Sequence, residues 1–376
     1  MRRLAVPALA LPLLAACSDV PEGCVAPEAL LAAPAVAAGP PVGGIRIEPG
    51  QTVWPDEADV SPDGSRIAVT CDGGVCLWDT TTGELLDDQA PPGGGDHLTF
   101  AGSEGTLLVS TGYDERREVG ELRLGDLRSG DTCTLLGHDI ERVEATEGAG
   151  GDVDALDVSP DGRLAATAAD DGRVGLWDVE AQERLAWLDL EESQPAALAF
   201  SPDGALLAVG GYDGVLELWD VEARERVRTG EGAVRDLAFS PDGRRLAAVP
   251  NEDPDLVLLD VDDLSAVTRL AASTDPATLG TGAVGDLAWS PDGTRLAFVE
   301  PAVDGPGTRV LAWDPVANVA RPLGPQDGSP ESVAWSPDGR HLYTVDPVDG
   351  VRRTRVVDGR PTGRSVTFET PEQIRA

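Results

Sequence analysis

Residues 155–188 read ALDVSPDGRLAATAADDGRVGLWDVEAQERLAWL, and this stretch decides the fold. The alternating residues ALDVS lead into Pro160-Asp161-Gly162, where Pro presets φ, Asp can bond the backbone two residues on and Gly accepts a positive φ. A second turn follows at Asp171-Gly172, the dipeptide of a two-residue hairpin loop. Alternation on both sides of these turns predicts four short strands, with no room for a helix.

The same unit recurs along the chain. Its Ser-Pro-Asp-Gly turn starts at Ser61, Ser159, Ser201, Ser240, Ser290 and Ser336. The last four intervals between these turns are 42, 39, 50 and 46 residues. The first interval is 98 residues, and we interpret residues 98–109 within it as a further unit whose turn has a different sequence. Such a period is typical of stacked or radial units that cannot bury their apolar faces alone. We therefore interpret the six turn aspartates as structural: Asp63, Asp161, Asp203, Asp242, Asp292 and Asp338.

Trp-Asp pairs end the predicted third strands at residues 78–79, 177–178, 219–220 and 313–314, and Gly137-His138 precedes a first strand. In these features the chain resembles the WD-repeat family of β-propellers. The resemblance implies that an Asp six positions before the Trp lies in the tight turn, as at Asp72, Asp171 and Asp213. It also implies a structural hydrogen-bond network that includes His138 and Trp177, with the complete set only in the third unit.

The third-strand aspartates give the number of units. They are Asp79, Asp126, Asp178, Asp220, Asp260, Asp314 and Asp358. We predict an all-β fold, a seven-bladed β-propeller of four-stranded antiparallel blades over residues 45–376, with six or eight blades if an end unit is misread. In the family one terminus commonly supplies the outer strand of a blade begun by the other. Residues 45–47 and 365–368 are both candidates for that strand.

The amino terminus predicts export. Arg2-Arg3 precedes an apolar run at residues 4–16. This run has 13 residues, whereas a helix needs about 20 residues to span a bilayer. Its length and its basic flank are typical of a signal peptide. Residues 14–17, LAAC, resemble a bacterial lipobox, which implies cleavage after residue 16 and lipidation of Cys17. Residues 17–44 are then a lipidated linker rich in Pro and Ala, and the protein is a lipoprotein of the cell membrane, on its extracytoplasmic side. The alternative is an ordinary secretory signal.

Four further cysteines would meet an oxidising compartment after export: Cys24, Cys71, Cys76 and Cys133. Four cysteines allow three pairings. Cys71 and Cys76 flank the hairpin of the first unit and form a possible disulfide, which would leave Cys24 for Cys133. The spacing does not match a zinc site, and we expect no metal.

Charge and motif content restrict the function. The net charge is −37, and the chain has no Lys, which argues against nucleic-acid binding. We interpret the charge as a solvated surface, with a face for a cation or basic partner as the alternative. Nucleophile-elbow and His-Glu-x-x-His motifs are absent, and the three histidines lie in different units, with His97 and His341 expected at the surface. We expect no catalytic residues and no cofactor.

The sequence therefore predicts a binding module: a lipid-anchored, monomeric propeller that presents one face to an unidentified protein or peptide. One alternative is a propeller enzyme of the lactonase or quinone-dependent dehydrogenase type, which would need convergent carboxylates or stacked aromatics at the channel. Another is an envelope assembly or sensor protein similar to the periplasmic propeller of the Tol system.

Overall fold

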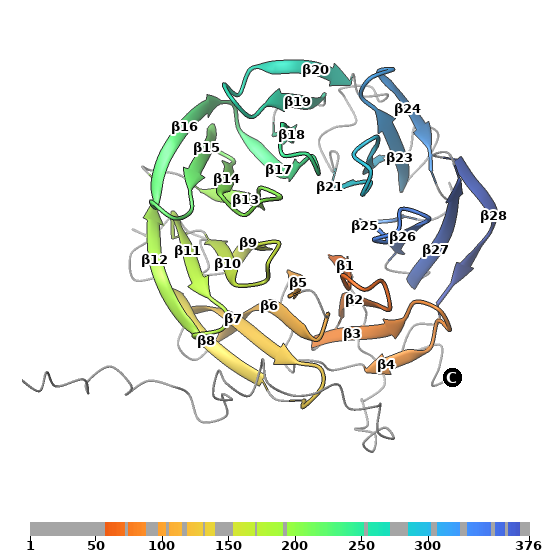
Figure 1. Ribbon diagram of the computed structural model, residues 1–376, viewed down its shortest axis with the longest axis horizontal. Coiled ribbons are helices and arrows are strands. Elements are labelled where there is room, and N and C mark those ends of the chain that lie inside the picture. Colours follow the sequence, from red (N-terminus) through yellow and green to blue (C-terminus); the bar gives the residue numbers. More distant parts are fainter. Residues whose placement is uncertain are drawn as a thin grey trace, which may run out of the picture.

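The computed structural model describes residues 57–71, 74–87, 97–102, 105–114, 119–130, 132–139, 153–169, 171–190, 194–251, 255–270, 285–301, 307–323, 329–346, 350–357 and 360–368. These residues form strands and turns, and none of them lies in a helix. Seven four-stranded antiparallel sheets, here called blades 1 to 7 in chain order, form a closed ring (Figure 1). The predicted all-β, seven-bladed propeller is confirmed.

In each blade the first strand lies innermost and the fourth outermost (Figure 1). Blades 1 to 4 comprise β1 (Ala58–Val60), β2 (Arg66–Cys71), β3 (Gly74–Asp79), β4 (Leu85–Asp87), β5 (Leu98–Ala101), β6 (Leu107–Asp114), β7 (Val119–Asp126), β8 (Thr132–Asp139), β9 (Val153–Val158), β10 (Leu164–Ala169), β11 (Arg173–Asp178), β12 (Glu183–Asp189), β13 (Pro195–Phe200), β14 (Leu206–Gly211), β15 (Val215–Asp220) and β16 (Glu225–Glu231).

Blades 5 to 7 comprise β17 (Val234–Phe239), β18 (Arg245–Pro250), β19 (Leu256–Asp260), β20 (Ala266–Leu270), β21 (Gly285–Trp289), β22 (Leu296–Pro301), β23 (Thr308–Asp314), β24 (Val319–Pro322), β25 (Ser332–Trp335), β26 (His341–Asp346), β27 (Gly350–Val357) and β28 (Arg360–Thr367). The third strands of blades 1 to 6 end at the aspartates predicted from the sequence. Asp358, expected in the same role for blade 7, lies outside the described residues.

Each Ser-Pro-Asp-Gly turn folds in the same way. In all six turns the Ser hydroxyl donates to the Asp carboxylate over 2.6–2.7 Å. The Ser Oγ also accepts a hydrogen bond from the first N–H of the second strand. In blade 3, for example, Leu164 N–H donates to Ser159 Oγ at 2.9 Å. The hydroxyl lowers the pKa of Asp203, Asp242 and Asp338. These turns are therefore held by ionised aspartates.

The turn glycine of blade 3 has a second constraint. Gly162 and Gly204 both have a positive φ, +72° and +70°. A Cβ at residue 162 would lie 2.0 Å from the backbone N of Gly102 in blade 2, whereas at residue 204 its nearest neighbour would be Pro160 Cδ at 3.8 Å. The turn of blade 3 therefore packs directly against the backbone of blade 2.

Gly162→Ala is expected to destabilise the ring by about 2–3 kcal/mol, and the matched Gly204→Ala by about 1 kcal/mol, because only the first adds a backbone clash to the positive-φ strain. Urea unfolding followed by Trp fluorescence measures both. Equal losses for the two variants would contradict the tight seam between blades 2 and 3.

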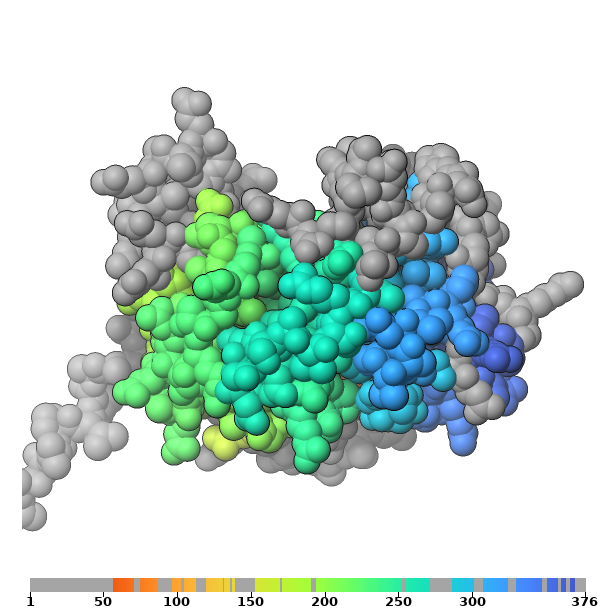
Figure 2. Space-filling model, turned by 90° about the horizontal axis from the view of Figure 1, so that it is seen from above, coloured from red at the N-terminus to blue at the C-terminus, as the bar shows by residue number. Residues whose placement is uncertain are grey.

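The hydrophobic core lies between blades. Seven clusters of buried side chains occur among the described residues, one at each seam between neighbouring blades. Trp78, Trp177 and Trp313 are the largest fully buried side chains, each at most 2% exposed. Figure 2 views the ring from its side and shows blades 4, 5 and 6, in green, teal and blue, packed side by side. Each blade is thus stabilised by its two neighbours.

The ring closes by side-chain packing between blades 7 and 1. The expected strand exchange between termini is wrong for the described residues, because β28 completes a blade whose other three strands, β25 to β27, also come from the C-terminal part of the chain. Phe368, at the end of the candidate segment 365–368, packs with Tyr343 and Trp78 instead. The other candidate, residues 45–47, lies outside the described residues.

Candidate functional site

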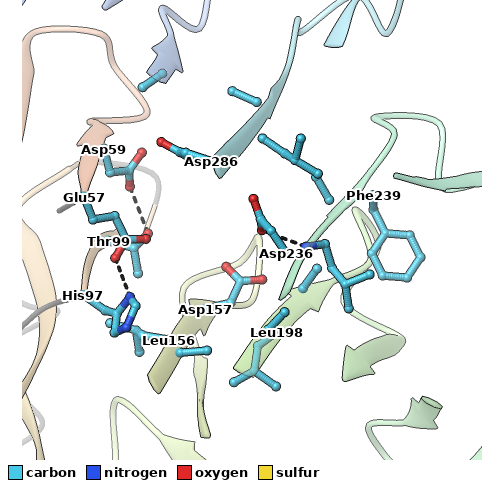
Figure 3. A pocket seen from close by; sticks show the side chains of 18 of the residues that line it. Glu57, Asp59, His97, Thr99, Leu156, Asp157, Leu198, Asp236, Phe239 and Asp286 are labelled. Carbon is cyan, nitrogen blue, oxygen red and sulfur yellow. Dashed lines mark hydrogen bonds and ion pairs between the residues drawn. The ribbon is translucent and has the colours of Figure 1, made fainter. Parts of the chain in front are cut away.

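A cavity of about 740 Å³ lies at the centre of the ring. The innermost strands of all seven blades line it: β1, β5, β9, β13, β17, β21 and β25. Figure 3 shows four aspartates with their carboxylates directed into this space, namely Asp59, Asp157, Asp236 and Asp286. Convergence of these carboxylates at the axis makes the cavity the candidate functional site.

The repeat explains why these carboxylates meet. Asp59 and Asp157 stand two residues before the Ser of their turns, and Asp236 and Asp286 stand four residues before it. Positions separated by two share one face of a strand, so both offsets present the side chain on the same side. Four different blades thereby place an acidic side chain at the ring axis.

Several of these carboxylates also join neighbouring blades. Asp157 accepts the backbone N–H of Phe200 in blade 4 at 2.6 Å, and Asp286 accepts that of Val333 in blade 7 at 2.7 Å. Asp59 accepts the N–H of Phe100 in blade 2 at 2.9 Å. The innermost strand of a blade has no further strand on the side that faces the ring axis. The N–H groups on that edge therefore need other hydrogen-bond acceptors. The carboxylates satisfy these donors.

Asp236 is held in a related way. Its Oδ1 accepts the N–H of Leu237 at 2.7 Å. Burial raises the pKa of this carboxyl group, and a hydrogen bond from the backbone N–H of Leu287 in blade 6 opposes that rise.

The ring suppresses ionisation of the cavity carboxylates. Each side chain keeps some exposed surface toward the cavity, but protein encloses it elsewhere. Burial raises the pKa of Asp157 and of Asp286 to about 7. Burial raises the pKa of Asp236 to about 8, and the neighbouring Asp286 carboxylate adds to this effect. Asp59 also has a raised pKa because of burial. These aspartates therefore keep their protons to a higher pH than exposed aspartates do.

A second polar group lies at the seam of blades 2 and 3. His138, on β8, is 1% exposed, and its Nδ1 lies 3.0 Å from Oδ1 of Asp171. Its Nε2 lies 2.8 Å from Oγ1 of Thr167, which also accepts the indole N–H of Trp177 at 2.8 Å. The structure thus brings His138, Trp177 and Asp171 together around a residue not predicted from the sequence, Thr167.

Blade 4 shows why this network is not repeated there. Val209 stands in the strand position of Thr167 and offers no hydroxyl. The indole N–H of Trp219 donates instead to Glu217, at 2.9 Å. Asp213 lies in its predicted turn but is exposed. Asp72 lies outside the described residues.

Thr167→Val is expected to lower the free energy of unfolding by about 2–3 kcal/mol, because it keeps the side-chain shape but leaves two buried groups, on His138 and Trp177, without their shared partner. Thr167→Ser keeps the hydroxyl and serves as the control. Thermal unfolding compares the two, and a Val variant as stable as the Ser variant would show that the network contributes no stability.

Comparisons with known proteins agree with the architecture. A family model described as WD domain, G-beta repeat matches residues 57–79, from the start of blade 1 to the end of β3. The chain is a WD-repeat β-propeller. A second model, described as Cytochrome D1 heme domain, matches residues 150–298 of this propeller, from blade 3 into blade 6. No curated protein matches the chain.

The cavity of this WD-repeat propeller fits a haem poorly. A haem carries its own carboxylates and needs axial ligands such as His, Met, Cys or Tyr. The cavity lining is acidic, which would repel those carboxylates, although it includes two residues of these ligand types, His97 and Tyr212. The match therefore agrees with the propeller architecture and assigns no cofactor to the cavity.

His97 is a residue whose place the sequence did not predict. Expected at the surface, it lies instead in the cavity wall, on the segment before β5, and pairs with Glu57 of blade 1. Among the described residues, no group of three His, Cys, Asp or Glu side chains could hold a metal ion. No helix in the described part of the propeller is long and apolar enough to cross a membrane.

The cysteines are described in part. Cys76 on β3 and Cys133 on β8 are buried, and each takes part in a disulfide. Cys71 ends β2, opposite Gly74, but its side chain lies outside the described residues, so the Cys71–Cys76 pairing stays a prediction. Cys17 and Cys24 also lie outside the described residues.

Proposed function

We propose that this WD-repeat propeller is a lipid-anchored interaction module outside the cytoplasm, a monomer that binds a partner protein or peptide through its central cavity. The cavity of about 740 Å³ carries this proposal, because all seven blades line it. Hydrogen-bonded turns on six of the seven blades hold the lining strands in place, and concave sites of this size are typical of ligand binding. The lining is asymmetric in charge, since its carboxylates come from blades 1, 3, 5 and 6 and, among the described residues, none comes from blades 2, 4 and 7.

Crosslinking in intact membranes, followed by mass spectrometry, tests the proposal. One partner is expected to dominate with the unchanged chain, and the same partner is expected to be lost with Ala238→Phe, which narrows the cavity with a phenyl ring. Val316→Phe places the same ring at a residue 98% exposed in a turn of blade 6 and serves as the control. An unchanged set of crosslinked proteins in Ala238→Phe would overturn the use of the cavity.

The proposed lipid anchor has its own test. Cys17→Ser is expected to move the protein from the membrane fraction to the soluble fraction, because stable anchoring depends on acyl chains attached at this residue. Cys24→Ser, which removes a cysteine outside the lipobox, is expected to leave the protein with the membrane. Continued tight membrane association of Cys17→Ser would count against lipidation.

An enzyme is the second candidate, favoured by one observation. Asp157 and Asp286 have pKa values raised to about 7, the range in which a carboxyl group is an effective general acid or base at neutral pH. A panel of hydrolase and dehydrogenase substrates tests it. Turnover that disappears in Asp157→Asn or Asp286→Asn would replace the binding module by an enzyme.

A further inference from the structure

We infer that a groove between blades 5 and 6 binds an extended peptide segment of a partner protein, one that places apolar side chains in the groove and an Arg or Lys side chain beside them. This goes beyond the proposed function, because the groove is a second site outside the central cavity. The evidence is a proline that removes a hydrogen bond made in the other six blades, the apolar side chains exposed beside it, and the charge of the groove.

The turn after the third strand is fastened differently in blade 6. In the other six blades a backbone N–H at the end of the third strand donates to the carbonyl of the residue that follows the turn glycine, over 2.7–3.1 Å. The donors are Thr80, Leu127, Val179, Val221, Val261 and Val356. The strand register places Pro315 in this position, opposite Thr294. Proline has no N–H, so blade 6 cannot make this bond.

The seam between blades 5 and 6, which are neighbours in the ring (Figure 1), is open beside Pro315. A groove of about 630 Å³ lies here, at the end of the ring that carries the Ser-Pro-Asp-Gly turns. Val179 and Val261, which make the bond in their own blades, are buried, whereas Pro315 is half-buried. The apolar side chains that line the groove are Leu258, Val267, Trp289, Pro291, Pro315 and Val316.

Trp289 shows the same opening from the inner side of the blade. An aromatic residue directly precedes the turn Ser in blades 4, 5 and 7 as well, and there it is buried: Phe200, Phe239 and Trp335. Trp289 is only half-buried. Part of its indole ring is therefore available to a ligand in the groove.

Val316 is an apolar residue at a polar position of the repeat. The residue two positions after the third-strand Asp is polar in blades 1 to 5, as Thr81, Arg128, Glu180, Glu222 and Asp262. In blade 6 it is Val316, which is 98% exposed, and Val267 of the same groove is 48% exposed. Exposed apolar side chains gathered in one place mark interaction surfaces.

Hydrogen bonds hold both walls of the groove in place. Asp314 accepts two backbone N–H groups of its own turn, at 2.9 and 3.1 Å. The Asn318 side chain of the same turn donates to the carbonyl of Arg269 in blade 5 at 3.4 Å. The indole N–H of Trp289 donates to the carbonyl of Ala238 in blade 5 at 3.1 Å. A preformed groove of this kind needs little ordering when a ligand binds.

The charge of the groove selects the occupant. Asp242 and Asp292 belong to the lining and are exposed, while its basic residue, Arg245, already pairs with Asp260. An Arg or Lys beside the apolar side chains of the ligand complements these aspartates. A second copy of this chain, with its net charge of −37, would be repelled. The groove therefore suits a segment of another protein that is apolar and basic.

Binding of the complete chain to end-blocked peptides at 150 mM salt tests the inference. The probe is a mixture of Leu-X-Leu-Arg peptides in which X is Ala, Pro, Ser or Val. One matched mixture has Glu in place of Arg, and another has Ser in place of both Leu residues. Saturable binding of the probe is expected, with an affinity about tenfold or more above either matched mixture. Equal affinity for the three mixtures, or no saturable binding of the probe, would overturn the inference.

Pro315→Val introduces the residue found in blades 3, 4 and 5 and returns the missing N–H. It is expected to close the seam and to weaken probe binding about tenfold or more, while urea unfolding shows a ring at least as stable as the unchanged one. A Pro315→Val chain that binds the probe as tightly as the unchanged chain would show that the proline does not make the site.

The double variant Val267→Thr/Val316→Thr removes exposed apolar groups from the groove without touching the core. It is expected to weaken probe binding about tenfold, whereas Val227→Thr, at an exposed position of β16 in blade 4, leaves it unchanged. Val316→Phe keeps an apolar side chain at the groove and is expected to retain binding. Equal affinity in the double variant and Val227→Thr contradicts the site. Displacement of the probe by decanoate, or a dimer that the double variant abolishes, would assign the groove to an acyl chain or a second copy instead.

The two proposals fail separately. If no probe peptide binds but one crosslinked partner still disappears in Ala238→Phe, only the groove is wrong. If the probe binds and Pro315→Val weakens it, but no partner in membranes depends on the cavity, the groove stands and the use of the cavity is wrong.

Discussion

A chain that ends at residue 325 is expected not to fold as a cooperative, soluble monomer. The truncation removes β25 to β28 and with them blade 7. Two seams then open, because blade 7 packs against blade 6 on one side and against blade 1 on the other. On the blade 1 side, Ile67 and Trp78, 0% and 2% exposed, lose Tyr343 and Phe368. A six-bladed remainder would present two uncovered apolar faces.

The expected loss exceeds the stability of an ordinary domain. Full burial of one large apolar side chain contributes about 1.5–3 kcal/mol, and each opened seam exposes several of them. A folded domain is stable by only about 5–15 kcal/mol, so losing both seams is enough to unfold the ring. Blade repeats also depend on their neighbours for stability, as in other repeat proteins.

Circular dichroism melts and size-exclusion chromatography measure the outcome. A chain ending at residue 368 removes only residues 369–376 and is the matched control, expected to melt cooperatively like the complete chain. A chain ending at residue 325 that is monomeric and melts in one sharp transition would show that the seams at blade 7 are not required.

The turn chemistry made the ring predictable from the sequence. Each Ser-Pro-Asp-Gly turn is local, because its hydrogen bonds join residues at most five apart, as between Ser159 and Leu164. Residues 98–109 could be recognised as a blade even without this turn, because their apolar alternation is retained as β5 and β6. Local patterns of this kind do not depend on which blade lies next to which.

The cavity carboxylates and Thr167 were not predicted, because their roles depend on contacts between blades. The acidic residues stand at two different offsets before the turn, as Asp157 and Asp236 illustrate, so no single repeat position is acidic. The net charge pointed to a solvated surface, and only ring closure shows that these side chains share one space. A usable signal exists: an acidic residue an even number of positions before the turn Ser lies on the axis-facing side.

The stability of the propeller is expected to fall by about 4 kcal/mol as the pH rises from 5 to 9, because its cavity aspartates must ionise in an enclosed, acidic space. A carboxyl group whose pKa is raised in the folded state binds protons more tightly there than in the unfolded chain. Its contribution to stability is complete below the unfolded pKa of 3.8 and is lost as the pH rises through the folded value. The folded values are about 7 for Asp157 and Asp286 and about 8 for Asp236.

The turn aspartates act in a different pH range. Asp203, Asp242 and Asp338 have pKa values below 3.8, so the stability they contribute is present above that pH and is lost as the pH falls below it. Measurements between pH 5 and pH 9 therefore report on the cavity and leave the turns ionised. The two groups together place the pH of greatest stability close to 4, where the turns are ionised and the cavity contribution has only begun to fall.

Asp236→Asn is expected to remove about half of this pH dependence, because Asp157 and Asp286 account for the rest. The full shift at this residue, from 3.8 to about 8, corresponds to about 6 kcal/mol, and about half of that is expected because the cavity admits water. The variant should match the unchanged chain within about 1 kcal/mol at pH 5 and exceed it by about 3 kcal/mol at pH 9, since the amide cannot ionise. Urea unfolding at pH 5, 7 and 9 measures the difference.

Glu222→Gln removes the same charge from an exposed turn and controls for general repulsion in a chain of net charge −37. If Asp236→Asn loses stability with pH as steeply as the unchanged chain, the Asp236 carboxyl group does not titrate between pH 5 and pH 9, and burial in the cavity does not raise its pKa.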